Sequence, residues 1–273
     1  MSTTTLIPTF TFAAQEKEGS TQLDKHHIGS VALSNKEKRE LVAETASINS
    51  ATTTLVASDL PFTPAKSFHI NSRGIPVLRL PFPPSELITT IHNLDGSVAY
   101  TSTRERRSSG NCVLSDAGGT DIIGTTYVFG PGKDPVLTRL DLGTSDLSAN
   151  TIKTLSKWTT RTQTFLLPDG RTFTWSYKRA VGFGGEGKKG TALVLTMGEK
   201  RIAVLIRDGG TRTLGSSSSS AGNGGELVIG EEVGGNDYIS EEVVVSSCLL
   251  MLKKEIDRRR MVQFIAISSA VSA

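Results

Sequence analysis

Short runs of alternating apolar and polar residues follow one another from about residue 66 to residue 230, with turn residues between them. Successive side chains of a strand point to opposite faces, so this alternation is typical of strands that are buried on one face. Many short strands at roughly ten-residue spacing predict an antiparallel sandwich or barrel. The predicted strands are residues 67–71, 75–80, 86–92, 98–104, 111–114, 122–129, 136–142, 152–156, 160–167, 172–178, 192–197, 201–207 and 226–230.

The clearest local pattern is a hairpin over residues 164–177. Pro168 presets the first turn position, and Gly170 can adopt the left-handed conformation. A three-residue Pro-Asp-Gly loop would place Phe165 opposite Phe173, whereas a two-residue Asp-Gly loop would place it opposite Thr174. Because register follows the buried face, we predict the three-residue loop, which keeps the aromatic residues together.

A different pattern follows the strands. Residues 243–252 are apolar nearly all round, and residues 253–260 are mostly charged. Ten apolar residues are too few to span a bilayer, so this run predicts a buried core helix. We expect its basic end to suit the negative pole of the helix dipole. Residues 261–273 are apolar again, and the pattern leaves open whether they continue the helix or form a strand.

Two segments lie outside this regular pattern. Residues 1–65 are irregular and rich in Ser and Thr, which predicts a disordered, low-complexity N-terminal arm ahead of one folded domain at 66–273. Residues 208–225 form a Gly/Ser tract with almost nothing to bury. We expect a flexible loop between two strands rather than a domain boundary.

Composition and the lack of targeting signals narrow the class of protein to which the chain can belong. The chain has 273 residues, of which 37% are hydrophobic and 21% charged, with a net charge of +3 and two cysteines. This excludes a disulfide scaffold, a coiled coil and a multispan membrane protein. No stretch reaches the roughly 18 apolar residues of a membrane span, and the first residues make a poor signal peptide. The default expectation is a location in the cytoplasm or nucleus; of the two we choose the cytoplasm, with peripheral membrane association as a further possibility.

The order of the elements resembles a known family. The resemblance is carried by Trp158, by the hairpin from Phe165 to Trp175, by the runs 201–205 and 225–229, and by the helix 243–252 with its basic tail. Together they resemble the tubby C-terminal-like fold of tubby proteins, plant LURP-one-related proteins, phospholipid scramblases and several fungal families of unknown function. The resemblance implies a mainly β, closed antiparallel barrel around a hydrophobic C-terminal helix. Members often bind phosphoinositides or lie at membranes, but their basic ligand-binding residues match no clear motif here.

Motifs for enzymatic chemistry are weak. Residues 182–187 match the dinucleotide pattern G-x-G-x-x-G, but a strand rather than a helix is predicted to follow them, so we interpret them as a hairpin loop. The four histidines lack metal-ligand spacing, and we predict no metal and no cofactor. Cys248 lies in the apolar run, which indicates a buried free thiol. We therefore predict a protein that is not an enzyme and has no catalytic residues.

Basic residues are the remaining functional signal. They form four clusters: Arg104/Arg106/Arg107, Lys178/Arg179, Lys188/Lys189 and Lys253/Lys254/Arg258/Arg259/Arg260. If two or more clusters converge on one face they would form a site for anionic lipid, whereas separately they are ordinary solvated surfaces. The residues that we select as the candidate lipid-binding site are Lys178, Arg179, Lys188 and Lys189.

The resulting hypothesis is a non-enzymatic β-barrel module that binds anionic phospholipid or a membrane-associated partner. The alternative is an intracellular scaffold for protein–protein interactions. The weakly basic charge does not indicate nucleic acid as a partner.

Overall fold

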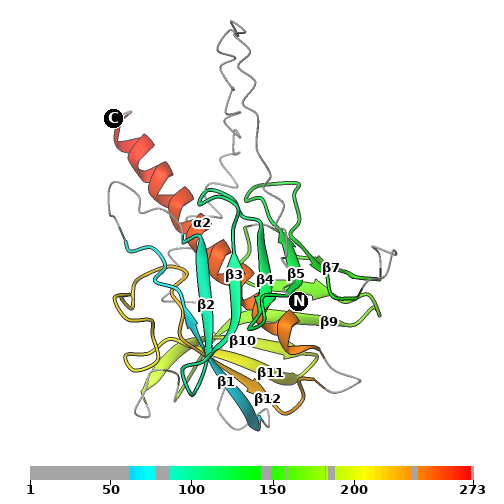
Figure 1. Cartoon of the computed structure of the whole chain (residues 1–273). Helices are drawn as coiled ribbons and strands as arrows, with labels where there is room; N and C mark the ends of the chain where they lie inside the picture. The colour runs from blue at the N-terminus through cyan, green and yellow to red at the C-terminus, as the bar shows by residue number, and fades with distance from the viewer. Residues whose placement is uncertain are drawn as a thin grey trace, which may run out of the picture. The chain divides into compact units, whose positions relative to one another are not determined.

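The described residues form twelve strands and one helix, and the strands close into an antiparallel barrel (Figure 1). The computed structural model describes residues 62–77, 86–142, 149–157, 159–181, 183, 188–234 and 239–271. Each strand pairs with its neighbours in sequence, and β1 pairs with β12 to close the ring. The elements are β1 (Pro64–Asn71), β2 (Ile88–Asn93), β3 (Val98–Thr103), β4 (Cys112–Asp116), β5 (Asp121–Thr126), β6 (Val136–Arg139), β7 (Thr151–Thr154), β8 (Gln163–Leu166), β9 (Thr172–Val181), β10 (Lys189–Met197), β11 (Lys200–Ile206), β12 (Glu226–Gly230) and α2 (Glu241–Val271).

The predicted fold class is confirmed: the protein is mainly β, and a closed barrel leaves no sheet edge. The strand predicted at residues 75–80 is wrong over its described part. Residues 75–77 form only an isolated bridge, from Ile75 to Ala221, and residues 78–80 lie outside the described part of the chain. Pro76 has no backbone N–H to donate to a ladder, which explains why pairing stops there. The predicted N-terminal arm also lies almost entirely outside the described residues, which begin at Phe62.

The β8–β9 hairpin has the predicted register. Phe165 lies opposite Phe173, and the two rings stack with their centroids 4.8 Å apart and their planes 2° from parallel. The Leu167 N–H donates to the Arg171 carbonyl at 2.9 Å, which leaves a three-residue loop between them. Gly170 has a φ of 86°, the left-handed conformation that this loop requires.

The core forms between the inner face of the barrel and the first half of α2. Aromatic residues of the strands belong to one hydrophobic cluster with helix residues 243–245 and 248–252. Trp175 is fully buried, and its indole N–H donates to the Ser247 hydroxyl at 2.9 Å. The predicted buried core helix is therefore confirmed, and the hydrogen bond sets its position against β9.

The helix continues well beyond its apolar run. It extends to Val271, which settles the open question of residues 261–271 in favour of a helix. The expectation for the basic residues is wrong, because residues 253–260 lie in the middle of α2 and its last turn holds no basic residue. The acidic first turn, Glu241 and Glu242, suits the positive pole of the helix dipole instead.

The Gly/Ser tract joins β11 to β12 as expected, but it buries more than expected. Residues 220–225 are buried between the barrel and α2. At Gly222 a Cβ would lie 2.4 Å from Cγ1 of Ile256 and 2.6 Å from the Leu252 carbonyl oxygen. The absence of side chains therefore lets this backbone approach the helix closely. The expectation that the tract has almost nothing to bury is wrong for these residues.

Candidate functional site

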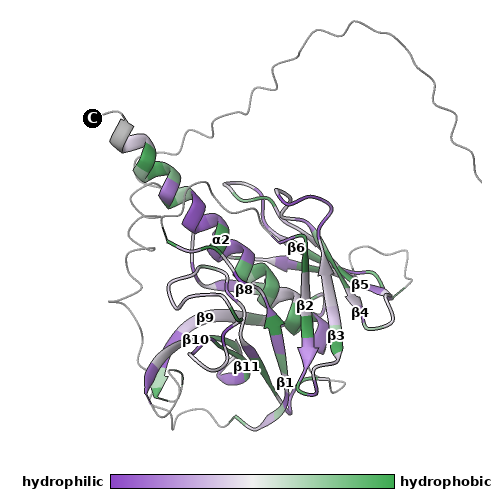
Figure 2. Cartoon of the chain, turned by 60° about the vertical axis from the view of Figure 1, so that its left-hand side comes forward, coloured by the Kyte–Doolittle hydropathy of each residue, from purple (hydrophilic) through white to green (hydrophobic). Residues whose placement is uncertain are grey.

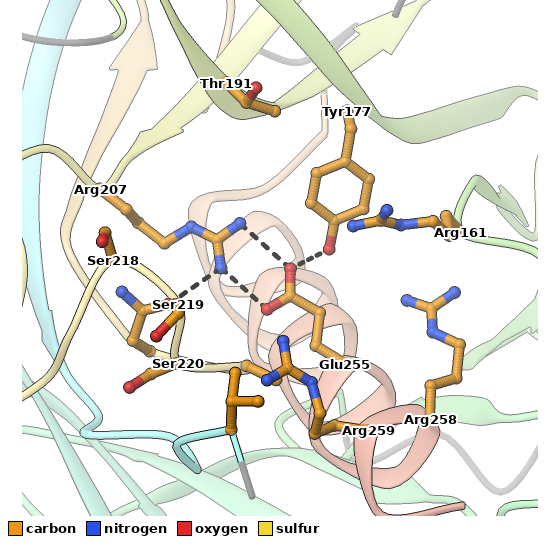
Figure 3. Close-up of a pocket in the computed structure, with 13 residues that line it drawn as sticks. Arg161, Tyr177, Thr191, Arg207, Ser218, Ser219, Ser220, Glu255, Arg258 and Arg259 are labelled. Carbon is orange, nitrogen blue, oxygen red and sulfur yellow. Dashed lines mark hydrogen bonds and ion pairs between the residues drawn. The ribbon is translucent and has the colours of Figure 1, made fainter. Parts of the chain in front are cut away.

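A cavity of about 410 Å³ lies where α2 passes β9, the end of β11 and the β11–β12 loop (Figure 3). Most of its polar lining is arginine or serine. The lining residues are Val77, Arg161, Tyr177, Thr191, Arg207, Ser218, Ser219, Ser220, Ala221, Asn223, Glu255, Arg258 and Arg259. Four guanidinium groups and one carboxylate give this lining a formal charge of +3.

Glu255 is held by four hydrogen bonds on the wall of the cavity (Figure 3). Arg207 donates to both of its oxygens, at 2.8 and 3.1 Å. The Tyr177 hydroxyl and the Gly222 N–H donate to it as well. Burial opposes the charged carboxylate, but Arg207 and the hydrogen bonds lower the pKa of Glu255 to about 2. The carboxylate is therefore charged at neutral pH, and its charge is matched by Arg207.

Three further guanidinium groups face the same cavity. Arg161 lies over the Tyr177 ring, 4.4 Å from its centroid. Arg258 is only 4% exposed and donates to the Thr160 carbonyl at 2.6 Å. The Nη1 atom of Arg259 is buried and has no hydrogen-bond partner among the described residues. Burial lowers the pKa of Arg259, and Glu255 opposes that effect.

The serine side of the cavity comes from the β11–β12 loop. Ser218, Ser219 and Ser220 lie beside Arg207 in the close-up (Figure 3). Ser217 contacts the Ser219 and Ser220 hydroxyls at 3.0 and 3.1 Å, which ties the loop together locally. Hydroxyl groups and planar guanidinium groups donate the hydrogen bonds that phosphate and carboxylate oxygens accept in proteins. The arrangement can therefore bind an anion.

The four residues selected from the sequence lie together elsewhere. Lys178 and Arg179 are on β9, Lys188 precedes β10, and Lys189 begins it, so all four belong to one hairpin. None of them lines the cavity. Arg179 pairs with Thr191, which does line it, so the hairpin adjoins the rim. Their role in lipid binding stays a prediction.

The sequence reasoning missed the residues that meet in the cavity. Arg258 and Arg259 were in a recognised basic cluster, and their position directly after a buried helical run could have identified them. Arg161 and Arg207 are single arginines, 46 positions apart in the chain, and no local pattern marks them. Only closure of the barrel brings them to the same helix.

Other candidate groups were also located. Gly182 and residues 184–187 lie outside the described residues, but β10 follows them, and a strand there is as predicted. In the described part of the chain no three His, Cys, Asp or Glu residues are grouped to hold a metal ion. His26 and His27 are not in that part. Cys248 is a buried free thiol, as predicted, and burial raises its pKa.

Comparison with known proteins adds one structural likeness. No protein-family model matches the chain, and no curated protein matches it either. The chain is similar to an X-ray structure of a protein from Arabidopsis thaliana, with 11% identity and a TM-score of 0.39. The match covers 70% of this chain and 92% of that one. The resemblance to the tubby C-terminal-like fold therefore stays a prediction.

Proposed function

We propose that this protein is a non-enzymatic β-barrel module that binds the headgroup of an anionic phospholipid in the arginine cavity. The observation that carries the proposal is the surplus of guanidinium groups over carboxylates in one partly enclosed site. Arginine forms paired, planar hydrogen bonds with phosphate oxygens, and its charge is retained when it is buried.

The cavity is more than a solvated basic surface. Arg258 is 4% exposed, and the charge of Arg207 is already matched by Glu255. The buried Nη1 of Arg259 lacks a hydrogen-bond acceptor among the described residues, and leaving such a donor unpaired is unfavourable by about 1–3 kcal/mol. A phosphate group in the cavity would supply that acceptor together with negative charge.

The proposal is tested by co-sedimentation of the full chain with neutral vesicles and with vesicles that contain a phosphorylated anionic lipid, across a salt series. We expect binding that requires the anionic lipid and weakens as salt rises, because exposed charges are screened. Inorganic phosphate and a soluble glycerophosphate serve as competitors, which separates a headgroup site from general attraction to a charged surface. Folded protein that ignores anionic vesicles at low salt would overturn the proposal.

A pair of variants localises the site. Arg259→Gln removes one cavity charge, and Arg171→Gln makes the same change at the β8–β9 turn, where Arg171 pairs with Asp169. Along β9, Trp175 contacts Ser247 and Tyr177 contacts Glu255, so the turn lies on the far side of Ser247 from the cavity wall. We expect Arg259→Gln to weaken vesicle binding several-fold and Arg171→Gln to leave it nearly unchanged. Equal losses would indicate non-specific attraction instead. The double variant Lys188→Glu with Lys189→Glu tests whether the adjoining hairpin contributes to vesicle binding.

A further inference from the structure

The C-terminal end of α2 projects beyond the barrel, and residues 266–269 there are exposed (Figure 1). Phe264 is 62% exposed and Ile267 is 36% exposed. Gln263, by contrast, is still buried and donates to the Pro76 carbonyl at 3.4 Å. The helix therefore stays attached at Gln263 while the next residues extend beyond that contact. We call residues 261–271 the helix tail.

The helix tail is unusually apolar for an exposed helix. It contains no Asp, Glu, Lys or Arg, and its residues are mostly Met, Val, Phe, Ile and Ala. In Figure 2 the colour of α2 changes from mostly hydrophilic to mostly hydrophobic along its projecting part. Met261, Phe264 and Ile267 are spaced by three residues and so lie along one side. Large apolar side chains that gather on one exposed element mark an interaction site.

The order of residues along α2 indicates the kind of partner. Arg258 and Arg259 line the cavity, and the apolar tail begins at Met261. At 1.5 Å per residue, Phe264 lies roughly 7.5 Å beyond Arg259 along the helix axis. The headgroup layer of a bilayer is about 5–8 Å thick on each side of its hydrocarbon core. The spacing thus matches an anionic headgroup at the arginines and acyl chains at Phe264 and Ile267.

We infer that the helix tail inserts into the acyl-chain boundary of an anionic membrane while the cavity holds a headgroup. This inference rests on the proposed function and adds a second, apolar contact on the same element. Interfacial helices bury apolar side chains about 5–10 Å deep and combine this with electrostatic attraction to anionic lipids. No helix in the described part of the chain is long and apolar enough to cross a membrane. The eleven residues of the helix tail are roughly 16 Å long, about half the thickness of the hydrocarbon core, so the tail can reach no further than one leaflet.

The test places a fluorescent reporter on the tail of the full chain. Phe264→Trp is mixed with vesicles of neutral lipid plus a phosphorylated anionic lipid, with bromine atoms on the acyl chains as quenchers. We expect a blue shift and strong quenching of the added tryptophan, read as the difference from the unmodified chain with its two native tryptophans. Neutral vesicles should give neither change.

Leu94→Trp is the matched control. Leu94 is 79% exposed on the β2–β3 turn, beside the end of the barrel where the Tyr100 hydroxyl donates to Glu241 at the start of α2. Its tryptophan should remain unquenched, since that end would face away from the membrane. Equal quenching of both tryptophans would overturn the inference, because it would indicate general adsorption or unfolding.

A second measurement separates this inference from the proposed function. Phe264→Ser with Ile267→Ser removes apolar surface without touching the cavity, and we expect roughly tenfold or greater loss of vesicle binding. Competition by soluble glycerophosphate for the remaining binding should be unchanged. Vesicle binding without tail quenching would overturn the inference and leave the headgroup site standing. A blue shift without quenching that grows with protein concentration, with dimers in solution, would also overturn it, because the tail would then pair with a second copy.

Discussion

Arg207, just after β11, and Glu255, in the middle of α2, form a bidentate ion pair with N–O distances of 2.8 and 3.1 Å. Both side chains are nearly buried, with exposed fractions of 12% and 8%. The same carboxylate accepts the Gly222 N–H at 2.7 Å, so one side chain joins the helix to a strand and to the β11–β12 loop. The ion pair therefore supports the wall of the arginine cavity as well as the fold.

Removing the Glu255 charge should change how stability depends on pH. The carboxyl pKa is about 2 in the folded protein against an ordinary value of 4.5, because Arg207 and the hydrogen bonds outweigh burial. Its contribution is therefore fully present above about pH 4.5 and is lost as pH falls towards 2. The shift corresponds to on the order of 3 kcal/mol. Urea unfolding should show Glu255→Gln to be destabilised by about 3–5 kcal/mol at pH 7, since Arg207 is left unpaired.

The same pair of proteins contains the control for this prediction. As pH falls from about 4.5 to about 2, the unfolding free energies of the parent and of Glu255→Gln should converge, because the carboxylate becomes protonated in the unfolded parent before it does in the folded one. A constant difference between pH 7 and pH 3 would contradict a charged, stabilising Glu255.

Gly222 should tolerate substitution far less well than Gly170. Both have a positive φ, 73° and 86°, so alanine is unfavourable at each by roughly 1–2 kcal/mol. At Gly170 a Cβ meets nothing within 4 Å, whereas at Gly222 it meets Ile256 and the Leu252 carbonyl below 3 Å. We expect Gly222→Ala to lower the free energy of unfolding by about 2 kcal/mol more than Gly170→Ala. Denaturant unfolding measures both, and equal losses would show that the loop does not need this close approach.

Local patterns predicted the strands well, because each strand carries its own signal. In the β8–β9 hairpin the aromatic residues Phe165 and Phe173 share a face, and Pro168 and Gly170 set the loop, so register followed from the sequence. The strand predicted at residues 75–80, which is absent over its described residues 75–77, shows the limit of that reasoning. Its residues are mostly apolar, but Pro76 cannot donate to a ladder, and Ile75 pairs instead with Ala221 far along the chain.

The candidate site could not be predicted in the same way, because it depends on tertiary contacts. Glu255, with Arg258 and Arg259, resembles an ordinary charged helix surface in the sequence. In the structure Glu255 and Arg258 are at most 9% exposed, because the β11–β12 loop and the neighbouring strands cover the helix there. The partner Arg207 follows a strand and is 48 positions away. The spacing of residues in the sequence carries no information about a tertiary contact of this kind.

The two cysteines should differ sharply in reactivity. Cys248 lies on α2 inside the barrel with no exposed surface, and burial raises the pKa of its thiol. Cys112 begins β4 and is partly exposed. Because the thiolate is the reactive form, we expect alkylation of the native protein at pH 8 to modify Cys112 and to spare Cys248. Mass spectrometry of the labelled peptides checks this, and in urea both should react. Modification of Cys248 in the native protein at the rate of Cys112 would contradict a closed core.

The hydrogen bond between Trp175 and Ser247 should leave a buried group unpaired when Ser247 is replaced but not when Trp175 is replaced. Ser247→Ala leaves the buried indole N–H without its acceptor, which is unfavourable by about 1–3 kcal/mol. In Trp175→Phe the Ser247 hydroxyl keeps its bond to the Val244 carbonyl at 3.1 Å, so the loss there comes mainly from reduced packing. Chemical unfolding of both single variants and of the double variant forms a cycle that isolates the pair. We expect a coupling free energy of about 1 kcal/mol or more. Ser247→Ala should destabilise the Trp175→Phe variant much less than it destabilises the parent protein. Additive losses would show that the hydrogen bond does not hold α2 against β9.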